Sequence, residues 1–184
     1  MQDKQLQAIR IVQVDDPDAD LSYLGVFSQT PGPDAIDLSL RSDWSPKYLR
    51  YFNPANPWTP EGWAHVTAEQ IETSLADLPD EWRTRLPEFT CKAHLLNAFQ
   101  NEQDCQRAID YGKGWTSIGI RAEAKLIVCG VVQNISSGGL WGIESDSSNE
   151  YLNEVGREEV AALRDILHAL GFAETDYDIK FAET

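Results

Sequence analysis

The clearest pattern along the chain is an alternation of apolar and polar residues within the stretch from Gly114 to Asp146. One parity holds Ser117, Gly119, Arg121, Glu123 and Lys125, and the other holds the apolar residues Ile118, Ile120, Ala122, Ala124, Leu126 and Val128. Because successive side chains of a strand point to opposite faces, this pattern predicts a long strand with one apolar face. Val131–Ile135 and Leu140–Ser145 follow after turn residues, and we expect them to complete an antiparallel meander.

The N-terminal part of the chain shows weaker strand patterns. Ala8–Val14 alternates and is rich in β-branched residues, which predicts a first strand with Tyr23–Ser28 as its hairpin partner. Ile36, Leu38 and Leu40 alternate weakly, and Tyr48–Phe52 is typical of a short strand. Asn53–Trp63 holds three prolines and two tryptophans, which indicates a long ordered loop or a flap.

Helical spacing begins after this loop. Thr67–Gln70 fits a capping box, and the helix that follows has apolar residues at Ile71, Leu75 and Leu78. Pro79 is suited to the first turn of a short second helix. Thr90 is expected to cap a third helix that ends at Gly112 or Gly114.

The last predicted helix has the best helix signals in the chain. Ser147–Glu150 fits a capping box, and an apolar stripe follows at Val160, Leu163, Ile166, Leu167 and Leu170. Gly171 is suited to end the helix, with Phe172 supplying the usual apolar contact. The tail Tyr177–Phe181 is expected to add an edge strand.

The order of these elements predicts the fold class. Strands, a helical segment, a meander and a final helix indicate an α+β protein rather than a doubly wound sheet. We expect an antiparallel sheet of about five strands, built from the N-terminal hairpin and the central meander. The sheet would pack against helices that include a long C-terminal one. Residues 1–184 are expected to form a single domain, with 53–113 as a loop and helical insertion.

The charge of the chain restricts its partners. The formal net charge is −15 and the sequence pI about 4.4. Binding to nucleic acid or to anionic membranes needs a basic face, so we expect neither, whereas a basic protein partner suits this charge. The three cysteines are odd in number and lack paired spacing. No apolar run approaches the roughly 18 residues of a membrane span, so a cytoplasmic location is expected.

Two short patterns suggest metal or nucleophilic chemistry without completing it. Asp16, Asp18 and Asp20 resemble the start of a calcium loop, but Leu21 and Phe27 stand where that loop needs Gly and Glu. Cys91 and His94 have the spacing of a shared ligand or nucleophile–base pair. No second Cys/His pair with ligand spacing exists in the sequence. Cys91 lies on the apolar stripe of the predicted helix, so it is expected to be a buried thiol.

The sequence lacks the common short motifs of catalytic and nucleotide-binding sites. The sequence contains no G-x-S-x-G, P-loop, G-x-G-x-x-G or H-E-x-x-H pattern. We therefore predict no catalytic residues, no resident metal and no cofactor, and expect that the protein is not an enzyme. Carboxylate-based metal sites stay open, because the chain has thirty acidic residues.

The most unusual charge pattern is a row of acids that runs into the last helix. Its members are Glu144, Asp146, Glu150, Glu154 and Glu158. A four-residue spacing stacks the last four on one helix face, where like charges repel by a few tenths of a kcal/mol per pair. The row is interpreted as a solvated helix face, as a contact surface for a basic partner, or as a divalent-metal site.

A second candidate site involves the polar face of the central strand. Arg121 and Glu123 point away from the apolar side, either as a solvent-facing ladder or as the floor of a cleft. Trp58 and Trp63 in the proline-rich loop would then cover that floor. This arrangement is the basis of the alternative function, a small-ligand or metal-dependent enzyme with its site between the sheet face and the Trp-rich loop.

Several phrases resemble an uncharacterised family of proteins from bacterial and phage or plasmid genomes. The phrases are Tyr23–Pro33, Tyr48–Pro54, Gly119–Ala124 and Gly139–Asp146, whereas residues 57–110 match least. The resemblance implies an origin on mobile genetic elements and carries over no functional residue. Together with the charge, it leads to the first hypothesis, a non-catalytic acidic binding protein. Such a protein could inhibit a basic host defence protein, for example a nucleic-acid-binding complex, by mimicking nucleic-acid charge.

Overall fold

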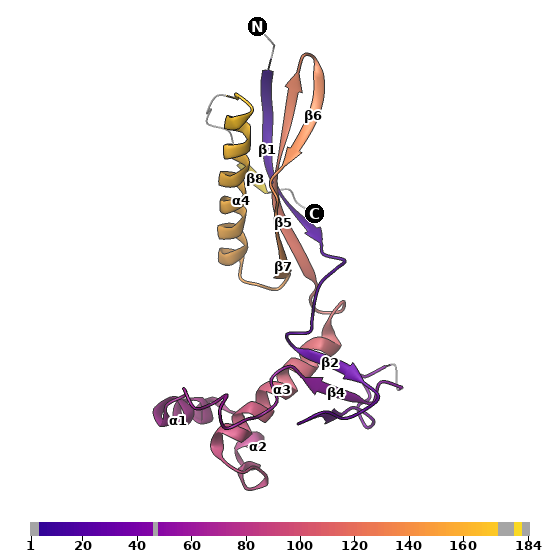
Figure 1. Ribbon diagram of the computed structural model, residues 1–184, viewed down its shortest axis with the longest axis vertical. Helices are drawn as coiled ribbons and strands as arrows, with labels where there is room; N and C mark the ends of the chain where they lie inside the picture. The colour runs from indigo at the N-terminus through magenta and orange to yellow at the C-terminus, as the bar shows by residue number, and fades with distance from the viewer. Residues whose placement is uncertain (1–3, 46–47, 173–178, 182–184) are drawn as a thin grey trace. The chain divides into compact units, whose positions relative to one another are not determined.

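The computed structural model describes residues 4–45, 48–172 and 179–181, and the chain divides into two compact units (Figure 1). The first unit comprises residues 1–19 and 112–184, and the second comprises residues 20–111. The insertion expected at 53–113 falls within the second unit except for residues 112 and 113, and that unit already begins at residue 20. The α+β fold class predicted from the order of elements is confirmed.

The first unit contains a five-stranded sheet. Its strands are β1 (Lys4–Asp15), β5 (Ser117–Val128), β6 (Val131–Ser136), β7 (Leu140–Glu144) and β8 (Ile179–Phe181). β1 pairs antiparallel with β5 along nearly its whole length, and β8 pairs parallel with β1. Part of the expected tail strand is thus present as β8, while residues 177–178 lie outside the described residues.

The predicted meander is a hairpin whose second strand is broken. β6 pairs with residues 123–128 of β5, and β7 pairs with residues 117–120 of the same strand. Since β1 occupies the other edge of β5, β6 and β7 follow each other along one edge. In the break, Ser137 N–H donates to the Ala122 carbonyl at 2.9 Å, and Ala122 N–H donates to Ser137 Oγ at 2.9 Å. The serine hydroxyl therefore replaces one backbone acceptor of the ladder.

Helix α4 (Asn149–Ala169) packs on the apolar face of this sheet (Figure 1). The predicted alternation of β5 is confirmed, because its even-numbered side chains from Ile118 to Leu126 are buried and Val128 packs against them. On the helix side, the buried apolar residues are Leu152, Val155, Val160, Leu163 and Leu167. Ile166 and Leu170, expected on the apolar stripe, are 37% and 44% exposed.

The ends of α4 match the sequence prediction at one terminus only. Ser148, not Ser147, is the N-cap, and its hydroxyl accepts from Tyr151 N–H. The expected box starting at Ser147 is wrong, because the Ser147 N–H is used in a turn with the Glu144 carbonyl. At the other end Gly171 has φ +79°, and the Phe172 N–H donates to the Leu167 carbonyl at 3.0 Å. This is the predicted glycine stop in its Schellman form.

The second unit holds its own three-stranded antiparallel sheet. The strands β2 (Gly25–Ser28), β3 (Ile36–Asp37) and β4 (Tyr51–Pro54) lie in the order β2-β4-β3. The predicted hairpin between the first two strands is therefore wrong, since β2 pairs with β4. Phe27 of β2 stacks on Trp44 with ring centroids 4.0 Å apart and contacts Phe52, so its aromatic packing keeps β2 in this unit.

Three α-helices and one 3₁₀ helix complete the described part of the second unit. They are α1 (Ala68–Asp77), α2 (Asp80–Arg83), the 3₁₀ helix η1 (Leu86–Glu88) and α3 (Lys92–Asp110). The capping box of Thr67 and Gln70 is confirmed, with both of its hydrogen bonds formed. α3 begins one residue later than expected, with Cys91 at the N-cap. Cys91 is exposed, so its predicted burial is wrong: the cap position precedes the buried face of the helix.

Candidate functional site

The predicted acidic row occupies the solvent side of α4. Glu150, Glu154 and Glu158 are exposed, and they lie on the side of the helix away from the leucines that pack on the sheet. Glu144 is half-buried at the end of β7, and Asp146 is exposed in the turn that leads into α4. The five acids thus follow one path from the sheet edge onto the open face of the helix.

The three helical acids of this row are not used inside the described part of the chain. None of Glu150, Glu154 and Glu158 forms an ion pair or a side-chain hydrogen bond with a described residue. Glu159 differs, because its carboxylate accepts from the Gly139 N–H at 3.0 Å and ties α4 to the broken edge strand. Glu150, Glu154 and Glu158 are therefore available to an external partner, whereas Glu159 is structural.

Metal-ligand geometry is not found among the residues that the structure describes: no group of three or more His, Cys, Asp or Glu side chains is placed to hold an ion. Asp16, which opens the calcium-like pattern, accepts from Ser117 Oγ at 3.1 Å and from the Gly142 N–H at 3.2 Å. This carboxylate joins the end of β1 to β5 and β7. Its hydrogen bonds give it a structural role.

The polar face of the sheet carries a network of charges around Glu123. Its carboxylate pairs with Arg10 at 2.6 Å and with Arg121 at 2.7 Å, and its side chain is only 14% exposed. The hydrogen bond from Arg10 is the main cause that lowers the pKa of Glu123, and Arg121 adds to it, while partial burial opposes both. Arg121 and Glu123, predicted as ligand-binding residues, therefore contact each other.

Replacing Glu123 by glutamine is expected to destabilise the protein at pH 7 and to matter less in acid. The folded pKa of Glu123 lies below its unfolded value, so the carboxylate adds stability above the usual glutamate range. That contribution disappears as the pH falls through the folded pKa. Urea unfolding of both proteins at pH 7 and at about pH 3 measures it. A difference in stability that grows toward acid would contradict the pairing.

Trp58 and Trp63, the other predicted ligand-binding residues, belong to the second unit, whereas Arg121 and Glu123 belong to the first. Trp58 stacks on His94 with ring centroids 4.7 Å apart. The Trp63 indole N–H donates to the Asn97 side-chain oxygen at 3.0 Å. Both tryptophans therefore have contacts with helix α3 of their own unit.

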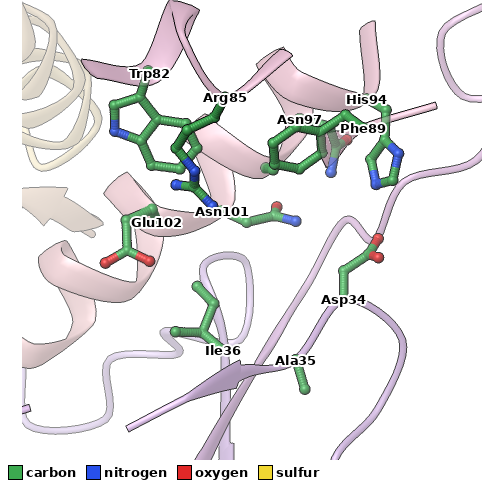
Figure 2. A pocket seen from close by; sticks show the side chains of 11 residues that line it. Asp34, Ala35, Ile36, Trp82, Arg85, Phe89, His94, Asn97, Asn101 and Glu102 are labelled. Atoms are coloured by element: carbon green, nitrogen blue, oxygen red, sulfur yellow. The ribbon is translucent and has the colours of Figure 1, made fainter. Parts of the chain in front are cut away.

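These contacts lie beside a pocket that the sequence did not reveal (Figure 2). The pocket has a volume of about 270 Å³, is open to solvent on one side, and is lined by α3, the α2–η1 segment with Phe89, and the residues from Asp34 to Ile36. Its polar lining includes Arg85, His94 and Asn101. One sequence signal could have located it: two asparagines interrupt the buried row of α3, which reads Ala93, Asn97, Asn101, Cys105 and Ile109.

Cys91 and His94 do not form the nucleophile pair considered from their spacing, since His94 bonds to Thr90 instead. His94 Nδ1 lies 3.1 Å from the Thr90 hydroxyl and accepts weakly from the Thr90 N–H at 3.4 Å. Its ring stacks on Trp58 and makes an edge-to-face contact with Phe89. Farther along α3, burial raises the pKa of the Cys105 thiol to about 12, which keeps it protonated and unreactive.

No family model, curated protein or solved structure matches the chain. None of the helices in the described ranges combines the length and the apolar character needed to cross a bilayer.

Proposed function

We propose that this chain is a non-catalytic binding protein that presents the acidic row of α4 to a basic protein partner. One observation carries the proposal: Glu150, Glu154 and Glu158 are exposed on one helix face and are not neutralised by any described residue. Like charges at this spacing oppose helix stability. Because the repulsion within the row destabilises the helix, the row is better explained as a contact surface than as a stabilising feature.

The net charge of −15 supports the same function. A strongly acidic surface speeds the approach of a basic partner and suppresses acidic ones. On a mobile genetic element, which the resemblance to phage and plasmid proteins suggests, such a protein would inhibit a host nucleic-acid-binding defence protein. It would do so by occupying the basic surface that otherwise neutralises phosphates.

The substitution Glu154→Lys is expected to separate binding from stability. The new ammonium group would face Glu150 and Glu158 at i−4 and i+4, so the helix should gain about 1 kcal/mol. Binding to the partner should weaken by about tenfold or more, since the centre of the acidic row changes sign. The partner is first captured from host lysate with the wild-type protein as bait. Thermal unfolding of the free protein then measures stability, and titration calorimetry with the captured partner measures affinity.

The matched control is Glu61→Lys, which changes the net charge equally at an exposed position of the second unit. It should leave affinity nearly unchanged. Binding of the wild-type protein to its partner should also weaken as the salt concentration rises from about 0.05 to 0.5 M. A DNA duplex should compete with the protein for the partner's basic surface. Salt-independent binding, or equal losses in the two lysine variants, would exclude the acidic row as the contact surface.

A further inference from the structure

The pocket of the second unit contains a buried polar group whose hydrogen bonding is incomplete. The Asn101 side chain is 3% exposed, and its Nδ2 has no hydrogen-bond partner among the described residues. A buried amide left this way costs about 1–3 kcal/mol. Asn97, one turn earlier, is satisfied: it accepts from Trp63 at 3.0 Å and donates to the Asn56 carbonyl at 3.2 Å. Asn101 therefore differs from its neighbour in having a donor left over.

That donor is directed toward the pocket. Figure 2 shows the Asn101 carboxamide extending from α3 into the space bounded by Phe89 and Asp34. A ligand atom that accepts a hydrogen bond would remove the cost of the orphaned amide. The buried amide is thus a positive indication of a ligand rather than a packing defect.

Arg85 supplies a second donor to the same pocket. Its guanidinium carbon lies 4.3 Å from the Trp82 ring centroid and 5.6 Å from that of Phe89, so two aromatic rings hold the group beside the pocket. Its Nε donates to Glu88 at 3.2 Å, which leaves the terminal N–H groups for other acceptors. A guanidinium held close to aromatic rings, with its terminal N–H groups unused, is well suited to bind a carboxylate.

Asp34 provides the opposite charge on the other side of the pocket. Its backbone has φ +52°, a left-handed conformation that aspartate tolerates better than most residues. One carboxylate oxygen accepts from the Trp58 backbone N–H at 2.6 Å, which fixes the side chain beside the pocket. The other lining carboxylate, Glu102, is already paired with Arg41 at 2.6 Å.

We propose that this pocket binds a free α-amino acid. Its carboxylate accepts hydrogen bonds from Asn101 and Arg85, its ammonium group faces Asp34, and its side chain contacts Phe89 and Ile36. A volume of about 270 Å³ suits a ligand of this size better than a nucleotide. A ligand with both charges can pair with Arg85 on one side of the pocket and with Asp34 on the other, whereas a ligand with only one charge can pair with only one of them.

The site is independent of the acidic row of α4, since every residue that lines it belongs to the second unit. Its test therefore fails or succeeds separately from that of the proposed function. The full chain is titrated by calorimetry and by thermal shift with each standard amino acid. Propionate and ethylamine serve as probes that carry one charge each. At least one amino acid should bind, and should do so at least about tenfold more tightly than either probe.

Asn101→Leu provides the decisive variant, because it removes the orphaned donor while keeping similar volume. The free protein should stay as stable as the wild type or gain stability, whereas affinity for the amino acid should fall about tenfold or more. Asp34→Asn, at an exposed position, should reduce the preference for the amino acid over propionate. Absence of binding by every amino acid, equal binding of either probe, or full affinity in both variants would overturn the proposal.

Discussion

Replacement of Leu163 by alanine is expected to lower the free energy of unfolding of the first unit by about 2–5 kcal/mol. Leu163 is fully buried between α4 and the sheet, in the cluster that contains Ile120 and Leu126. Truncation removes apolar contacts and leaves a cavity that the surrounding sheet cannot close. Urea unfolding followed by amide exchange in β5 reports on this unit specifically.

Ile166→Ala is the matched control on the same helix. Ile166 is 37% exposed, so the same kind of truncation should cost less than about 1 kcal/mol. Alanine also has the higher helix propensity, which offsets part of that loss. Equal costs at positions 163 and 166 would mean that α4 does not pack on the sheet through the face that carries Leu163.

The second large effect is expected at Gly119, where alanine should cost about 1–3 kcal/mol. A Cβ added at this position would lie 2.4 Å from Cε3 of Trp141, closer than two carbon atoms can approach. The Trp141 indole lies across the glycine and is held by a hydrogen bond from its N–H to the Gly138 carbonyl at 3.2 Å. The glycine is needed because the ring occupies the place of a side chain.

The sign of this effect should reverse when the tryptophan is absent. Glycine within a strand is otherwise about 0.5–1 kcal/mol less favourable than alanine. In a Trp141→Ala background, Gly119→Ala should therefore stabilise the protein. Urea unfolding of the wild type, both single variants and the double variant gives the coupling energy. A destabilisation of the same size in both backgrounds would exclude the ring as the reason for the glycine.

Local patterns predicted the parts of the fold that depend on local physics. The alternation in β5 fixes which side chains face the core, and Gly171 with Phe172 fixes the end of α4, because both depend on a few neighbouring residues. The partner of β2 depends on packing of Phe27 against Trp44 and Phe52 from later in the chain. Sequence proximity instead favoured β1, and that prediction was wrong.

The two candidate sites also differ in whether they depend on neighbouring or on distant residues. The acidic row on α4 is readable from its four-residue spacing, and the structure adds that its helical members are exposed. The pocket was missed because Asp34, Arg85 and Asn101 lie far apart in sequence and meet only in the folded second unit. The one local sequence signal of the pocket is the pair of asparagines, Asn97 and Asn101, in the buried row of α3.

The antiparallel pair β1–β5 also has a consequence for how the two units are connected. The Asp16 N–H donates to the Ser117 carbonyl at 3.0 Å, so the chain leaves and re-enters the first unit at neighbouring points. β1 and β5 thus form a hairpin whose turn is replaced by residues 20–111, and a connection placed at a turn leaves the ladder and core of the first unit intact. The acidic helix belongs to the first unit and the Asn101 pocket to the second, so a substitution in one of the two proposed binding surfaces should leave the other unaffected.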